Sequence, residues 1–168
     1  MNKTMKATLS AGALLGLAGA ANADFAGQTI LGPLGPGSSV GGDTSTSTDD
    51  NNGFTTGTPG GSWSGADDVY QLNWPGGSIT VDLLFTHASG DLDLFLWDSD
   101  QNTNIVASTS TSDNEGFFGT LAAGTYYMTV DGWAGDSNSY TLNVVPTPAA
   151  AGVLGMAGLA GITRRRRA

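Results

Sequence analysis

Apolar and polar positions alternate with a period of two through much of the chain after Asp67. This period predicts half-buried β-strands, because successive side chains of a strand point to opposite faces. Residues 79–86 show the pattern most plainly, with Ile79, Val81, Leu83 and Phe85 at every second position. The alternation also predicts strands at residues 70–72, 92–97, 105–106, 126–131 and 140–144.

Turn-forming residues separate these segments. The sequence predicts turns at Pro75-Gly76-Gly77, at Ser89-Gly90, over residues 98–104, at Ala122-Ala123-Gly124 and over residues 132–139. About seven or eight short strands joined by short connections, with no helical period, indicate an all-β fold of antiparallel pairs. The fold class predicted is a jelly-roll-like β-sandwich.

The segment before these strands has a different composition. Residues 24–63 are rich in Gly, Ser and Thr and carry acidic residues, and residues 43–50 contain no apolar side chain. Such a stretch is typical of a loop or lead-in. Ile30, Leu31, Leu34 and Val40 indicate that part of it packs on the sandwich as an early strand.

The first 23 residues have the layout of a secretory signal peptide. Lys3 and Lys6 precede an apolar run over residues 7–20, and Ala21-Asn22-Ala23 is a small-x-small cleavage site. We expect signal peptidase to cut after Ala23, so that the exported chain begins at Asp24.

Charge is divided sharply along the 168 residues. All 15 acidic residues and none of the six basic ones lie between Asp24 and Thr163, which gives that segment a formal charge of −15. Nucleic acid is excluded as a partner, because binding it needs cations that displace counterions. The chain has no cysteine, so it has neither a disulfide nor a thiolate metal site.

The last 23 residues, 146–168, form a three-part tail. Pro146-Thr147-Pro148 is followed by 14 uncharged, mainly small or apolar residues and then by Arg164, Arg165, Arg166 and Arg167. This order resembles the PEP-CTERM sorting signals that exosortase enzymes recognise, with Thr147 in place of the acidic residue. The resemblance implies processing by an exosortase-like enzyme, transient membrane insertion through an apolar C-terminal helix, and retention at the cell envelope, cell surface or extracellular matrix. A plain anchor that is never cleaved is the alternative.

Four motifs within residues 64–145 resemble the bacterial pre-peptidase C-terminal (PPC) domain. They are Asp68-Val69-Tyr70-Gln71-Leu72, Gly90-Asp91-Leu92-Asp93-Leu94-Phe95-Leu96, Gly124-Thr125-Tyr126-Tyr127-Met128-Thr129-Val130-Asp131-Gly132 and Ser139-Tyr140-Thr141-Leu142-Asn143-Val144. That family is a jelly-roll sandwich similar to the collagen-binding modules of secreted collagenases, and its members usually follow a peptidase. The resemblance implies a non-catalytic module.

Calcium is the cofactor that the carboxylates favour, since the ion takes six to eight oxygen ligands. The related collagen-binding modules hold calcium where the lead-in meets a strand, and carrying this over gives Asp49, Asp50, Asn52, Asp67 and Asp68 as ligands. Residues 98–102 have the spacing of an EF-hand start but lack its later glycine and glutamate, so a turn is the first interpretation.

Catalytic signals are sparse. His87 is the one histidine, and no nucleophile elbow, zinc-protease motif or phosphate loop occurs. A hydrolase using acids alone, with Asp91 and Asp93 as its pair, remains an alternative.

The aromatic residues suggest a binding platform for sugar rings or for a protein. Most of Trp63, Trp74, Trp97, Trp133 and Tyr127 are expected in the core. Trp97 and Tyr127 lie opposite the main apolar set of their strands, so the sequence predicts them as the exposed ligand-binding pair.

The sequence therefore predicts an exported envelope module that binds polysaccharide or protein, with a purely structural surface component as a further alternative.

Overall fold

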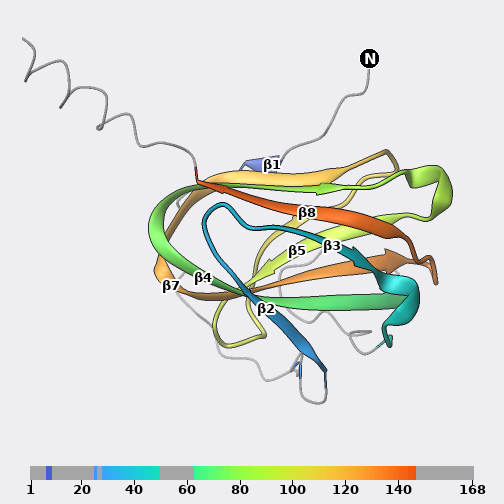
Figure 1. Cartoon of the computed structure of the whole chain (residues 1–168), viewed down its shortest axis with the longest axis horizontal. Helices are drawn as coiled ribbons and strands as arrows, with labels where there is room; N and C mark the ends of the chain where they lie inside the picture. The colour runs from blue at the N-terminus through green and yellow to red at the C-terminus, as the bar shows by residue number, and fades with distance from the viewer. Residues whose placement is uncertain (1–6, 9–24, 26–27, 50–62, 147–168) are drawn as a thin grey trace, which may run out of the picture.

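The computed structural model describes residues 7–8, 25, 28–49 and 63–146, and this part of the chain is almost entirely β-structure (Figure 1). Two single-turn 3₁₀ segments, η1 (Thr44–Thr46) and η2 (His87–Ser89), accompany the strands. The strands are β1 (Ala7–Thr8), β2 (Ile30–Leu34), β3 (Ser39–Asp43), β4 (Trp63–Leu84), β5 (Leu92–Trp97), β6 (Asn104–Ser108), β7 (Glu115–Trp133) and β8 (Ser139–Pro146).

Two long strands, β4 and β7, belong to both layers of a sandwich. Hydrogen bonding follows the order β3-β8-β4-β7-β5-β6, with β2 beside β4 and β1 beside β7. The first half of β4 pairs with β2 and with the second half of β7, which in turn pairs with β5. The second half of β4 pairs with β8 and with the first half of β7. Figure 1 shows both strands curving from one layer into the other.

The predicted turns at residues 75–77 and 122–124 are wrong, because both are corners inside continuous strands. Pro75 lies opposite Ala123 and Gly77 opposite Leu121, so the ladder between β4 and β7 continues through the bend. Gly76 and Gly77 have φ of 93° and 102°, which a side chain at Cβ would resist. Glycine therefore lets the two strands bend together. As a result β4 and β7 are long strands, where the sequence predicted short ones.

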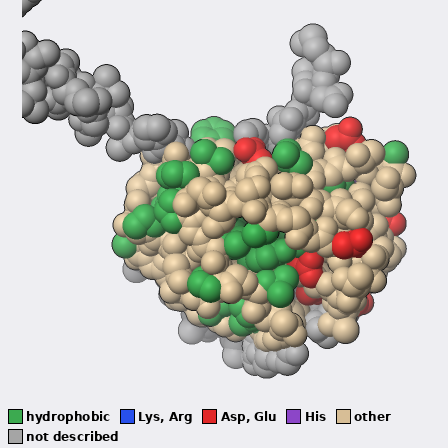
Figure 2. Space-filling view, viewed as in Figure 1, with side chains coloured by type: hydrophobic (Ala, Val, Ile, Leu, Met, Phe, Trp, Pro, Cys, Tyr) green, Lys and Arg blue, Asp and Glu red, His purple; other side chains and the backbone are tan. Residues whose placement is uncertain are grey.

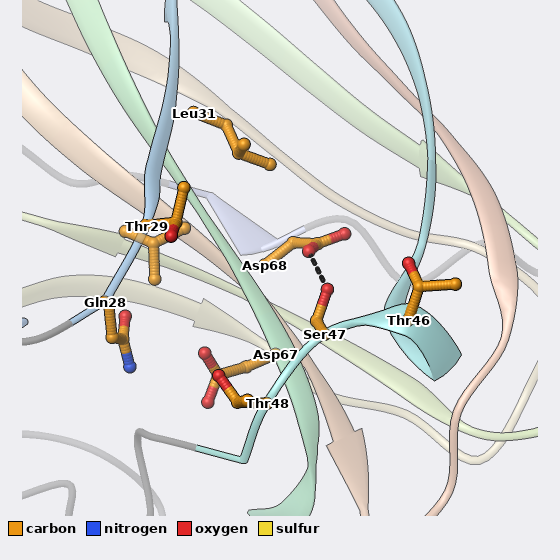
Figure 3. Close-up of a pocket in the computed structure, with 9 residues that line it drawn as sticks. Gln28, Thr29, Leu31, Thr46, Ser47, Thr48, Asp67 and Asp68 are labelled. Carbon is orange, nitrogen blue, oxygen red and sulfur yellow. Dashed lines mark hydrogen bonds between the residues drawn. The ribbon is translucent and has the colours of Figure 1, made fainter.

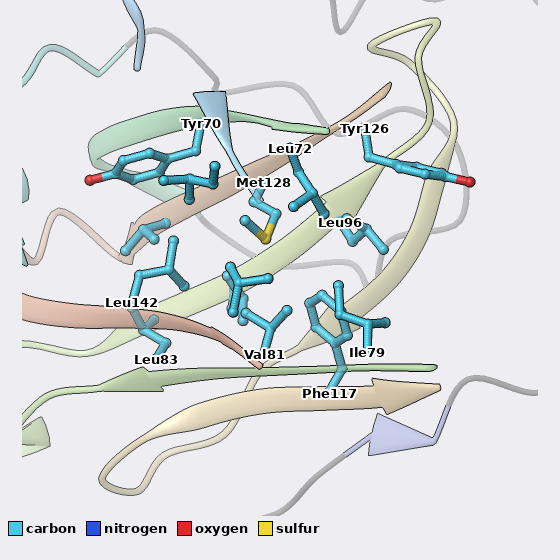
Figure 4. Close-up of a cluster of buried hydrophobic side chains, with 14 of the residues drawn as sticks. Tyr70, Leu72, Ile79, Val81, Leu83, Leu96, Phe117, Tyr126, Met128 and Leu142 are labelled. Carbon is cyan, nitrogen blue, oxygen red and sulfur yellow. The ribbon is translucent and has the colours of Figure 1, made fainter. Parts of the chain in front are cut away.

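The main core lies between the two layers (Figure 4). The alternating apolar residues meet there as predicted, and the inward side of β5 supplies three leucines. Its members with no exposed surface are Leu72, Ile79, Val81, Leu83, Leu92, Leu94, Leu96, Phe117, Met128, Val130, Leu142 and Val144. The alternation therefore predicted correctly which apolar side chains face this core.

A second apolar cluster covers the opposite face of β5. Phe95 and Trp97 are fully buried there against Phe25, Trp63 and Val69. The prediction that Trp97 is exposed is therefore wrong, because residues from the lead-in and from the start of β4 cover this face. The Trp97 indole also donates to Thr129 Oγ1 at 3.0 Å. Tyr127, the second residue predicted to be exposed, is half-buried, and the centroid of its ring lies 5.7 Å from that of Phe25.

Several predictions fall outside the described residues. Ala23, Asp50, Asn52, Thr147, Pro148 and the four arginines are among these, whereas Pro146 ends β8. Ala7 and Thr8, within the predicted signal peptide, pair in parallel with Phe117 and Phe118. The described part of the chain contains no helix with the length and apolarity needed to cross a membrane.

Candidate functional site

Three carboxylates form a row across adjacent strands on the face of the second apolar cluster. Asp131 of β7 lies directly opposite Asp67 of β4 on one side and Asp93 of β5 on the other. Directly opposite side chains share a face, with Cβ atoms about 5 Å apart. All three residues are buried.

Asp131 is the centre of this carboxylate row and has an unusual environment. Its side chain has no exposed surface, and neither carboxylate oxygen has a hydrogen-bond partner among the described residues. Burial, followed by the charges of Asp67, Asp93 and Asp49, raises the pKa of Asp131 to about 9. A charged carboxylate is therefore strongly disfavoured here unless a cation neutralises it.

Asp93 is held by the aromatic residues around it. Trp63 Nε1 donates to Asp93 Oδ2 at 2.5 Å, and the Trp63 ring packs edge-on against Phe95 with centroids 5.3 Å apart. Burial raises the pKa of Asp93 to about 7 despite this hydrogen bond, and the charges of Asp91 and Glu115 add to the rise. Asp93 thus exchanges its proton near neutral pH.

Glu115 adds another buried acid nearby. Its carboxylate accepts hydrogen bonds from Ser108 and Ser110, and burial nevertheless raises its pKa.

Among the described residues the sole basic side chain is His87, whose Nδ1 lies 3.1 Å from Asp91 Oδ1. Figure 2 shows carboxylates of the described residues gathered toward the right of the visible face. Within the described part of the chain, protons, His87 or bound cations are therefore what can neutralise the buried acids.

The lead-in reaches the start of β4, as the predicted calcium set requires, and Asp67 and Asp68 both line a pocket there with lead-in residues (Figure 3). The backbone N–H of Asp67 donates to Thr48 O at 3.1 Å, and the neighbouring Asp49 is exposed. Asp68 points to the other face of β4, where it accepts hydrogen bonds from Ser47 Oγ and Tyr140 OH. The charges of Asp67 and Asp49 thus act on Asp131, whereas the carboxylate of Asp68 is engaged by Ser47 and Tyr140.

The second acidic sequence forms a turn, as predicted. Asp98 N–H donates to Thr103 O, and Asp100 Oδ1 accepts from the N–H groups of Asn102 and Thr103. The carboxylate of Asp100 therefore stabilises the turn. Within the described residues, no three acidic or histidine side chains stand as a preformed metal centre.

A pocket lies beside the carboxylate row, where β4 begins and β7 ends. Trp63 and Trp133 stand edge to face there with centroids 5.6 Å apart, and Trp133 is 37% exposed. The remaining lining residues are Asp91, Asp93, Thr109, Ser110 and Thr111. We call this the Trp63–Trp133 pocket.

Sequence reasoning missed Asp131 and the pairing of Trp63 with Trp133. A signal for Asp131 was present, because it continues the polar face formed by Tyr127 and Thr129. Its position opposite Asp67 depended on the strand register, which the alternation alone did not give.

No family model matches this sequence, and no curated protein matches it either. Among solved structures, the chain is similar to the pre-peptidase C-terminal domain of a collagenase from Bacillus anthracis. The similarity has a TM-score of 0.50 at 16% identity and covers 70% of this chain and 95% of that domain. At this identity it shows the fold: the described sandwich is a PPC-like β-sandwich.

Proposed function

We propose that this chain is an exported, non-catalytic module of the cell envelope or extracellular matrix, processed and anchored through its C-terminal segment. The observation that carries the proposal is a PPC-like sandwich placed between a signal-type segment and a sorting-type tail. In the Bacillus anthracis protein this fold is the C-terminal domain of a collagenase. A module of this kind acts through where it is placed and what it binds.

The mass of the chain isolated from the cells that produce it tests export and processing. We expect an N-terminus at Asp24 and a C-terminus without Arg164–Arg167. Deleting residues 2–23 should keep the chain inside the cell with its tail intact. An envelope-associated chain that retains both ends at their full mass contradicts the processing step, and a wild-type chain found in the cytoplasm contradicts the proposal as a whole.

We also propose that a divalent cation, with calcium as the probe, braces the carboxylate row. The supporting observation is Asp131, whose two buried oxygens have no partner in a described domain without lysine or arginine. A cation would draw Asp67 and Asp93 toward Asp131 and offset their repulsion. The ligands then come from three strands and bridge β4, β7 and β5.

Calcium should raise the melting temperature at pH 8. A ligand at a hundredfold excess over its Kd adds about 2.7 kcal/mol, which corresponds to a shift of roughly 10 °C or more for a domain of this size. Asp131→Asn should abolish the shift, and Asp98→Asn, an equal charge change on an exposed turn, should leave it intact. If Asp68→Asn abolishes it and Asp131→Asn does not, the ion lies with the ligand set predicted from sequence. No shift with millimolar calcium refutes the cation.

A hydrolase is the second candidate, and one observation favours it. Asp91 and Asp93 line the same pocket, and burial raises the pKa of Asp93 to about 7, which suits a general acid. Incubation with polysaccharides and measurement of new reducing ends separates the two functions. We expect no release; release that Asp93→Asn removes would establish the enzyme.

A further inference from the structure

The Trp63–Trp133 pocket combines one exposed aromatic ring with a polar wall. Its volume is about 180 Å³, and it lies where β4 begins, where β5 begins and where β7 ends. Trp133, which lines it, is one of the large apolar side chains exposed in the described part of the chain. An exposed aromatic ring beside polar groups is typical of a small-ligand site.

The aromatic side of the pocket is fixed in place before any ligand arrives. Trp63 is clamped by its hydrogen bond to Asp93 and by edge contacts with Phe95 and Trp133. The Trp133 backbone N–H donates to Asp91 O at 3.0 Å, which ties the end of β7 to the residue before β5. A preformed site loses little conformational entropy when it binds.

The polar side of the pocket offers mainly hydrogen-bond acceptors. One oxygen of each carboxylate is engaged, Asp91 Oδ1 near His87 and Asp93 Oδ2 with Trp63. Both side chains line the pocket, with Asp91 6% and Asp93 2% exposed. Ligand hydroxyl groups would donate to them in short, charge-assisted bonds.

Hydroxyl side chains complete the wall. Ser110 Oγ bonds Glu115 and Ser112, which fixes its position, and Thr109 and Thr111 flank it. These side chains can both donate to and accept from a ligand rich in hydroxyl groups.

We infer that the Trp63–Trp133 pocket binds one unit of a neutral polysaccharide, with the apolar face of a sugar ring on Trp133 and its hydroxyl groups on Asp91 and Asp93. A pyranose presents C–H groups on its face and hydroxyl groups at its edge, which matches a ring platform beside a carboxylate wall. An anionic sugar is excluded, since the described domain has no lysine or arginine and the pocket itself contains two acids. This inference rests on the proposed function and names its ligand class.

Native electrophoresis in gels containing a neutral polysaccharide tests it. The probes are dextran, a mixed-linkage β-glucan and a galactomannan, with alginate as the anionic control, and the protein is the chain as the cells export it. We expect at least one neutral gel to retard the wild-type chain and alginate not to retard it. Trp133→Ala should restore free migration.

Phe118→Ala is the matched control, because Phe118 is a comparably exposed aromatic residue on the other half of β7. It should be retarded like the wild type. Asp91→Asn should weaken retardation at least tenfold in apparent Kd while the melting temperature confirms that the variant folds. Free migration of the wild type in all three neutral gels, or retardation that Trp133→Ala leaves unchanged, overturns the inference. If the wild-type chain binds a protein and none of the glycans, the inference is also overturned. The mass of the isolated chain reports on export and processing separately, so the two failures are distinguishable.

Discussion

Replacing Asp131 by asparagine keeps nearly the same shape and removes a buried carboxyl that has no hydrogen-bond partner in the described part of the chain. Burial and the neighbouring carboxylates raise the pKa of Asp131 from 3.8 to about 9 in the folded chain. Because the folded state holds this proton more tightly than the unfolded state, its stabilising contribution is complete below about pH 4 and declines as the pH rises toward 9.

The magnitude follows from the width of that window. Each pH unit inside it changes the free energy of unfolding by about 1.4 kcal/mol, so the rise from pH 5 to pH 8 removes about 4 kcal/mol through this one group. A domain of this size has a total stability of about 5–15 kcal/mol, so the change is large. Asp131→Asn should abolish this part of the pH dependence, and at pH 8 the variant should be more stable than the wild type.

Urea unfolding at pH 5, 6, 7 and 8, with a chelator present, measures the effect. The wild-type midpoint should fall steadily with pH, and the Asp131→Asn curve should be flatter by about 4 kcal/mol across the range. Asp98→Asn makes the same charge change on an exposed turn and should run parallel to the wild type. Parallel curves for wild type and Asp131→Asn would refute the argument that burial holds this carboxyl neutral.

Three further substitutions test the packing around the site. Gly132→Ala should prevent folding or destabilise it by about 3 kcal/mol or more, because the new Cβ would lie 1.8 Å from Asp136 O. Gly135→Ala, with φ of 93° but open space around its Cβ, should cost only about 1 kcal/mol, and equal melting temperatures for the two variants would contradict this account. Trp63→Phe removes the donor to Asp93, so unfolding should become easier by about 1–3 kcal/mol and the pKa of Asp93 should rise further, as NMR titration of its carboxyl carbon would show; an unchanged titration would contradict it.

The sequence predicted the parts of this fold that depend on local pattern. The alternation placed Leu92, Leu94 and Leu96 on one face of a strand and Asp93, Phe95 and Trp97 on the other, and the structure has this division. Pro75-Gly76-Gly77 was misread as a turn because glycines with positive φ serve both a turn and a corner. Only the pairing partner distinguishes these two uses, and pairing is a long-range property.

The candidate site was predictable in part. Asp67 and Asp49 were named as ligands through the resemblance to collagen-binding modules, and the charges of both act on Asp131 in the structure. Asp131 and Trp133 could not be predicted as members of the site, because the register of β7 against β4 is what places them opposite Asp67 and Trp63. Trp97 was predicted as exposed because its cover, Phe25 and Trp63, comes from residues outside its own strand.

The arrangement of the outer strands affects when the domain can fold during synthesis. β3 is hydrogen-bonded to β8, with Val40 opposite Leu142, and β8 also lies between β3 and β4 as an inner strand of its layer. Because β4 and β7 run through both layers, neither layer can close while the other is missing a central strand. Folding therefore awaits the last strand and is expected to be slow, since nearly all stabilising pairs join distant parts of the chain. A chain interrupted before Ser139 leaves β3 without its partner, and such an incomplete product is expected to be open to proteolysis until it is removed.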